Sequence, residues 1–222
     1  MVWDWSVRKQ FILALGLSTA VGVGLFFYSA LSSHTTDFAY LLWNLFLAWI
    51  PVILSVRLVQ VLSHKLWSSW EALGLSLLWL IFLPNSFYMI SDFIHLSSAP
   101  TNQVLVYAVT FTSIIYSAVV LGFLSLYMIH IELKKRINSR EASFWIGLTL
   151  LICSLAIYVG RDLRWNSWDV LTNPGGVIFD ISDRLMHMSM YPQILSTAGV
   201  FFVLLGSMYI LAWSGLKLLR QR

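Results

Sequence analysis

Two short polar segments carry most of the side chains in this sequence that could do chemistry. The first contains Asp92 and His95, which are three residues apart. On a helix this spacing places a carboxylate and an imidazole on one face. Such a pair can bind a divalent metal ion, or the carboxylate can orient the imidazole for proton transfer. Asp92 and His95 are therefore candidate catalytic residues or metal ligands. The alternative is a structural role, in which both hydrogen-bond to the next loop at the membrane surface.

The second segment is dense in charged and aromatic residues and directly follows a long apolar run. Paired arginines suit bidentate contacts with phosphate or carboxylate, and tryptophan covers acyl chains. If the preceding helix continues, the segment forms one stripe of Arg161, Arg164, Trp165 and Trp168, and another of Asp162, Asn166 and Asp169. The candidate substrate-binding residues are Asn85, Arg161, Arg164, Trp165, Asn166, Trp168 and Asp169. The alternative is an electrostatic clasp, in which Asp92 or Asp169 pairs with Arg161 or Arg164.

The elements that position these segments follow from composition. The chain has 222 residues, of which 59% are hydrophobic and 11% are charged, against roughly 25% charged residues in a soluble domain. A soluble fold of this length leaves much of its chain exposed and cannot hide so many apolar side chains in one core. Most of these side chains must therefore face lipid.

Six apolar runs reach the roughly 20 residues that a helix needs to cross a bilayer. They cover about 11–31, 38–62, 68–90, 104–130, 142–160 and 193–217. The runs are continuous rather than alternating, which indicates helices and not a barrel. We expect residues 1–222 to form a single all-α integral membrane domain. It should be a polytopic bundle of six transmembrane helices with a longer outer loop before the last one.

Two local features bear on the helices. Pro84 lies within the third run, where its ring removes the backbone hydrogen bond to the carbonyl of Leu80 and predicts a kink. Gly16, Ala20 and Gly24 recur at every fourth residue of the first run. Small residues at this spacing let another helix approach closely, and we expect a seam within the chain rather than a homodimer face.

Basic residues in the connections predict the orientation. Of the fourteen Lys and Arg residues, three lie on one side of the membrane and the other eleven lie on the side that holds both termini. Those three are Arg161, Arg164 and Arg184. Because cytoplasmic loops carry an excess of Lys and Arg, we expect both termini in the cytoplasm. Both polar segments then lie at the outer interface.

Three motifs in the sequence resemble a family of bacterial multi-pass membrane proteins described only as a domain of unknown function. They are Leu47-Ala48-Trp49-Ile50-Pro51; Pro84-Asn85 followed by Tyr88, Asp92 and His95-Leu96; and Gly160-Arg161-x-x-Arg164-Trp165-Asn166-Ser167-Trp168-Asp169. The resemblance covers nearly the whole chain. It implies a location in the bacterial plasma (inner) membrane, and it implies no activity, cofactor or catalytic residue.

Three classes of function are compatible with these features. The favoured one is an outer-interface polar site that binds or processes an anionic lipid-linked substrate. Its partners would be the bilayer and an anionic lipid headgroup, and a divalent metal is the cofactor that Asp92 and His95 would hold. A transporter or channel for a small solute is the second, although the central thirds of the spans carry no Asp, Glu, Lys or Arg. A non-catalytic scaffold is the third. Nucleic acid is not expected as a partner, because the positive charge is spread over short turns.

Overall fold

The computed structural model describes residues 5–187 and 190–220, and this part of the chain contains helices and no strand. Six helices are long: α1 (Trp5–Ser33), α2 (Tyr40–Leu62), α3 (Trp70–Tyr88), α4 (Val104–Lys134), α5 (Ser139–Asp162) and α8 (Gln193–Arg220). The shorter elements are the 3-10 helices η1 (Met89–Ser98) and η2 (Thr101–Gln103), α6 (Asp169–Thr172) and α7 (Pro174–Met186). The predicted all-α class is confirmed.

All six long helices are apolar enough and long enough to cross a membrane. Each of them coincides with one of the six predicted apolar runs, and most boundaries agree within a few residues. The third candidate span is longer than predicted, because η1 continues α3 as far as Ser98. The prediction of six transmembrane helices is therefore confirmed.

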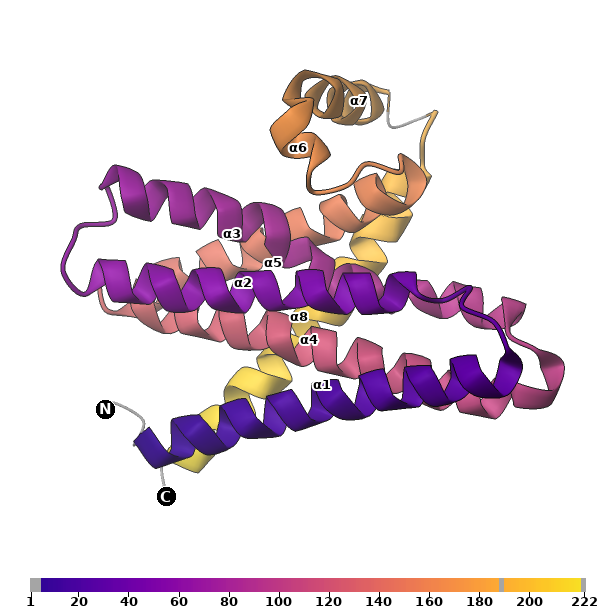
Figure 1. The fold of residues 1–222 in the computed structure, drawn as a ribbon. Helices are drawn as coiled ribbons and strands as arrows, with labels where there is room; N and C mark the ends of the chain where they lie inside the picture. Colours follow the sequence, from indigo (N-terminus) through magenta and orange to yellow (C-terminus); the bar gives the residue numbers. More distant parts are fainter. Residues whose placement is uncertain (1–4, 188–189, 221–222) are drawn as a thin grey trace.

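Consecutive long helices run in opposite directions, so the loops gather at two ends of the bundle (Figure 1). We call the end where α1 begins and α8 ends the terminal end. At the other end, which we call the distal end, α1 and α5 end and α6 and α7 lie above the bundle (Figure 1). Both polar segments belong to the distal end.

Helix α4 forms the centre of the bundle, and α1, α2 and α3 pack on it. Phe111, Ile114, Leu121 and Leu126 on α4 are fully buried. Helix α3 lies directly on the backbone of α4 at Gly122, where a Cβ atom would lie 2.7 Å from Ser86 Cβ. Helices α1 and α2 pack extensively on α4, and α3 packs mainly on α2 and also on α4 at Gly122.

The close approach of α1 to α4 occurs at Gly22. A Cβ atom there would lie 3.1 Å from Ile114 Cγ1. Gly16 and Gly24 face open space, with no atom within 4 Å of a Cβ built on either. The predicted seam at Gly16, Ala20 and Gly24 is therefore wrong in register. The reason is that a period of four residues describes one face of α1, and packing on α4 uses a neighbouring face.

A buried carboxylate closes the terminal end. Glu132 is 3% exposed, and its oxygens accept hydrogen bonds from Lys135 (2.6 Å) and Arg136. The Arg136 guanidinium also donates to the backbone oxygen of Leu62 at 2.8 Å and lies over the ring of Trp67. These basic residues therefore tie the end of α4 to the end of α2, in addition to their expected effect on orientation.

Candidate distal-end polar site

The two polar segments meet at the distal end. Arg161 Nη1 donates to Ser91 Oγ at 3.4 Å. Closer to the bundle centre, Asn85 Nδ2 donates to Ser167 Oγ at 2.9 Å. Gly160 lies against the ring of Tyr88, because a Cβ atom there would lie 3.2 Å from Tyr88 Cε2. The end of α3 and the end of α5 are thus in direct contact, which a shared site requires.

The 3-10 geometry of η1 sets the directions of Asp92 and His95. With three residues per turn, residues i and i+3 eclipse each other along the helix. Asp92 is 1% exposed, and its Oδ2 accepts a hydrogen bond from Asn44 Nδ2 on α2 at 3.3 Å. His95 is exposed, and its ring meets that of Tyr40 edge to face with centroids 5.6 Å apart. The two side chains therefore share one face of η1, and the turn between them leads from the buried carboxylate of Asp92 to the exposed imidazole of His95 at the surface of the bundle.

Arg161 supplies the positive charge of a polar cluster that also contains Asp92, Tyr88 and His95, which we call the distal cluster. It interacts electrostatically with Asp92, Tyr88 and His95. Within the described ranges no carboxylate oxygen lies within 4.0 Å of a guanidinium nitrogen of Arg161, and Asp92 makes no ion pair. The clasp that we considered between α3 and α5 therefore consists of hydrogen bonds and packing and not of a direct ion pair.

The Tyr40 hydroxyl also belongs to the cluster. It interacts electrostatically with Asp92, Tyr88 and Arg161. Its oxygen is buried and has no hydrogen-bond partner in the part of the chain that the structure describes. A buried polar atom without a partner is costly, and in a native protein such an atom calls for an explanation. The cluster thus contains one hydroxyl whose hydrogen-bonding capacity is unused.

Helix α5 ends at Asp162 and does not continue through the second segment. Arg164 has a φ of 59°, in the left-handed region that non-glycine residues rarely adopt. The expected stripe of Arg161, Arg164, Trp165 and Trp168 is therefore wrong. Arg164 is exposed and lies beyond the helix end, while Arg161 is half-buried in its last turn. The two arginines share the distal end without sharing a helix face.

Three of the candidate binding residues are occupied by contacts within the distal loop. Trp165 Nε1 donates to Asp180 Oδ2 on α7 at 2.8 Å. The backbone N–H of Asn166 donates to Asp169 Oδ2 at 2.6 Å. These bonds hold α6 and α7 against the end of α5. Trp165, Asn166 and Asp169 therefore build the loop, and Asp180 is a partner that sequence reasoning did not identify.

Trp168 contributes an aromatic surface beside the cluster. Its ring meets Phe82 of α3 with centroids 5.3 Å apart and lies 6.4 Å from the ring of Trp43 on α2. Trp168 is 38% exposed and Trp43 is 53% exposed. The neighbouring Ser167 hydroxyl donates to the backbone oxygen of Ile81 at 3.3 Å, within the stretch of α3 that contains Pro84. The loop after α5 thus crosses α3 and reaches α2.

No group of three or more His, Cys, Asp or Glu residues that could hold a metal ion occurs among residues 5–187 and 190–220. Asp92 and His95 also face different surroundings, the bundle and the surface. Sequence reasoning missed the roles of Tyr40 and Ser91. A tyrosine or serine near the end of an apolar span is too common to mark a site, so no signal in the sequence distinguished them.

Six membrane-spanning helices with a polar cluster at one end define a multi-pass integral membrane protein. Residues 43–210 match the family described as "Protein of unknown function (DUF1361)", and the chain belongs to that family. The resemblance to a membrane family of unknown function is confirmed. No curated protein and no solved structure matches the chain.

Proposed function

We propose that the distal end faces outward from a bacterial plasma membrane and binds the phosphate group of an anionic lipid or lipid-linked substrate. The observation that supports this proposal best is the environment of Arg161. Its guanidinium has five N–H donors in a fixed planar arrangement. Among the described residues it donates to the Ser91 hydroxyl and interacts with the Tyr88 hydroxyl, and both of these groups are neutral.

A half-buried cation without a direct ion pair can bind a ligand anion. Charge-assisted hydrogen bonds between guanidinium and phosphate are about twice as strong as neutral ones and are often bidentate. The Asp92 carboxylate accepts a hydrogen bond from Asn44, and it makes no ion pair with Arg161 in the described ranges. Arg164, which is exposed, supplies a second positive charge at the same end.

The surroundings of Arg161 suit a lipid rather than a soluble anion. Aromatic side chains concentrate at the headgroup level of membranes, where an apolar ring and a polar group can both be satisfied. Trp168 and Trp43 form an exposed aromatic surface next to the cluster. The acyl or isoprenoid chain of a lipid whose phosphate contacts Arg161 would cover this surface.

His95 is the acid–base candidate if the lipid is also processed. Its imidazole is exposed and lies within electrostatic reach of Arg161, where a bound phosphate or ester would sit. Asp92 is 1% exposed and is better placed to orient Asn44 and the end of α3 than to meet a substrate. We therefore assign Asp92 a positioning role.

Native mass spectrometry of the purified protein can test the proposal, with phosphatidylglycerol as the anionic probe and phosphatidylcholine as the zwitterionic one. Arg161→Gln should weaken phosphatidylglycerol binding by about tenfold or more, because a hydrogen bond to a charged group contributes about 1.5–3 kcal/mol. The matched control is Arg140→Gln, which removes an exposed arginine at the terminal end. Equal loss of binding in both variants, or none in Arg161→Gln, would refute a distal anion site.

A further inference from the structure

We propose that α7 is an interfacial helix, which lies in the bilayer leaflet at the distal end with one apolar face against lipid. Five residues at helical spacing form this face, which we call the exposed face: Ile178, Phe179, Ser182, Leu185 and Met186. Four of them have large apolar side chains. Phe179 is 70% exposed and Met186 is 74% exposed within the chain. An apolar patch of this kind marks a surface that a partner covers.

The opposite face of α7 is held by the protein. Val177 is buried, and Asp180 accepts a hydrogen bond from Trp165 Nε1 at 2.8 Å. One turn further along, the guanidinium carbon of Arg184 lies 3.8 Å from the ring centroid of Tyr191. Residues three and four apart share a helix face, so these contacts occupy one side of α7. They leave the exposed face uncovered by the described residues.

The path of the chain brings α7 beside the membrane spans. Ser167 donates to the Ile81 backbone oxygen at 3.3 Å, and the Trp168 ring packs on Phe82 with centroids 5.3 Å apart. Both α3 residues lie inside the candidate span Trp70–Ser98. Ile81 is seven residues before the end of α3, which is about 10 Å along the helix axis. The chain therefore turns back along α3 before α6 and α7 follow on the same flank of the bundle (Figure 1).

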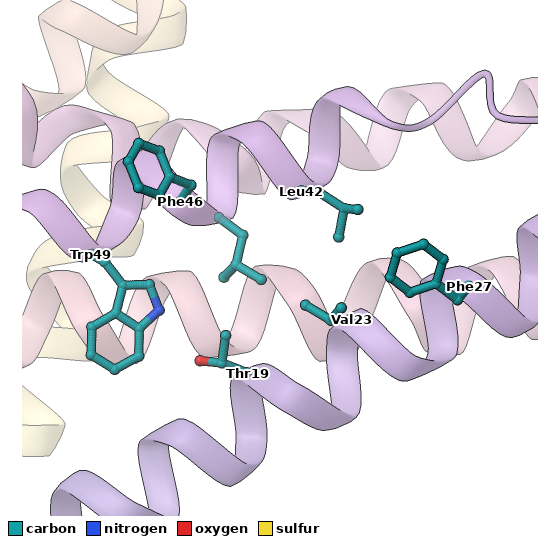
Figure 2. Close-up of a pocket in the computed structure, with 7 residues that line it drawn as sticks. Thr19, Val23, Phe27, Leu42, Phe46 and Trp49 are labelled. Atoms are coloured by element: carbon teal, nitrogen blue, oxygen red, sulfur yellow. The ribbon is translucent and has the colours of Figure 1, made fainter.

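The exposed face of α7 resembles the lipid-facing sides of the long helices. Phe27 and Phe46, at the cleft between α1 and α2, are likewise exposed, and the seven side chains drawn there include no charged one (Figure 2). On α7, Asp180 and Arg184 lie on the protein side, and Asp183 lies at the border of the two faces. A helix with one apolar and one charged face is typical of segments in the membrane interface. We therefore assign lipid as the partner.

Site-directed spin labelling of the protein in lipid nanodiscs tests the proposal. Ile178→Cys, Phe179→Cys and Met186→Cys each place a nitroxide on the exposed face. Power saturation then compares its accessibility to oxygen, which concentrates in lipid, with that to a water-soluble nickel chelate. Oxygen should have the greater access at all three positions, as it should for Leu17→Cys, which is exposed within the α1 span. The matched water-facing control is Thr36→Cys in the α1–α2 loop, where the order should be reversed.

Two results of this measurement would overturn the proposal. Greater access of the nickel chelate to the exposed face would show that the face meets water. Low access of both reagents would show that protein covers it, either a second copy or another partner. The native Cys153 is buried, so the unmodified protein serves as the unlabelled blank.

A charge on the exposed face gives an independent measurement. Phe179→Asp should make the α7 amides exchange with solvent at least about tenfold faster in nanodiscs, because moving one phenylalanine side chain from water to an apolar environment changes an equilibrium constant by that factor or more. The matched control is Phe144→Asp on α5, which is 66% exposed near the terminal end. It should leave the exchange of α7 unchanged. The same exchange rate of α7 in both variants would contradict the lipid contact.

Discussion

Replacing Gly122 by alanine tests how α3 is held in position. A Cβ atom on Gly122 would lie 2.7 Å from Ser86 Cβ and 2.8 Å from Phe87 Cε1. Carbon atoms in good contact are about 3.5–4.0 Å apart. Helix α3 must therefore move away from α4 by about 0.8 Å to accommodate one methyl group.

Neither neighbour can yield by a simple side-chain movement. Phe87 is fully buried, and the Ser86 hydroxyl donates to the backbone oxygen of Ala48 on α2 at 3.4 Å. Overpacking a well-packed core costs about 1–3 kcal/mol, and the higher helix propensity of alanine recovers at most about 1 kcal/mol. We expect a net loss of about 1–2 kcal/mol. On the scale of domains of this size this lowers the unfolding midpoint by about 2–8 °C.

The assay is thermal unfolding in detergent followed by intrinsic fluorescence, with Gly147→Ala on α5 as the matched control. A Cβ atom at Gly147 would have no neighbour within 4 Å, so only helix propensity acts there and the midpoint should stay or rise. A Gly122→Ala protein that is as stable as the Gly147→Ala protein would refute the packing of α3 on α4. Because η1 continues α3, the same result would also contradict the position of the distal cluster in the structure.

Three further predictions concern the two ends of the bundle. Glu132→Gln removes the carboxylate shared by Lys135 and Arg136 and should cost about 1–2 kcal/mol, because both cations are partly exposed and stay solvated. The exposed Glu141→Gln should change stability by less than about 0.5 kcal/mol; chemical unfolding in mixed micelles measures both. Trp165→Phe removes the hydrogen bond to the α7 carboxylate, so the amides of α7 should exchange with solvent faster by hydrogen-exchange mass spectrometry, while α5 stays protected. A cysteine at Asn102, at the distal end, should react with an impermeant maleimide in intact cells, and one at His64 only after permeabilisation. The reverse labelling pattern would contradict the predicted orientation.

The transmembrane helices could be predicted from the sequence because burial in lipid imposes a simple rule on it. Every span must be apolar over about 20 residues, whatever its neighbours are. The limits of α2 and α5 therefore differ from the predicted runs by three residues or fewer. The pairing of helices is not readable in the same way, because any apolar face can pack on any other. The shift of the α1 contact from Gly16 to Gly22 illustrates this.

The distal site was predictable only in part. The meeting of the two segments follows from their shared depth, since both end spans that lead to the same side of the bundle. The end of α5 at Asp162 could not be predicted from the sequence. A left-handed residue after a helix is usually glycine or asparagine, whereas the residue in that conformation here is Arg164. The bond between Asn44 and Asp92 joins residues 48 positions apart, and no local pattern encodes such a pair.

What separates a binding site from a structural clasp in this protein is which polar groups still have unused hydrogen-bonding capacity. Lipid supplies no partners, so a residue that serves only the fold should be fully satisfied by the protein. The Trp165 N–H meets that criterion because it donates to Asp180, and the Asn85 amide is partly satisfied by its bond to Ser167. Arg161 does not meet it, because its charge has no carboxylate partner in the described structure, and the buried Tyr40 hydroxyl beside it has no hydrogen bond there. If Arg161 served the fold alone, its half-buried and unpaired charge would only destabilise the protein. A bound anion would pair with this charge, and the interaction would contribute to the affinity for the anion.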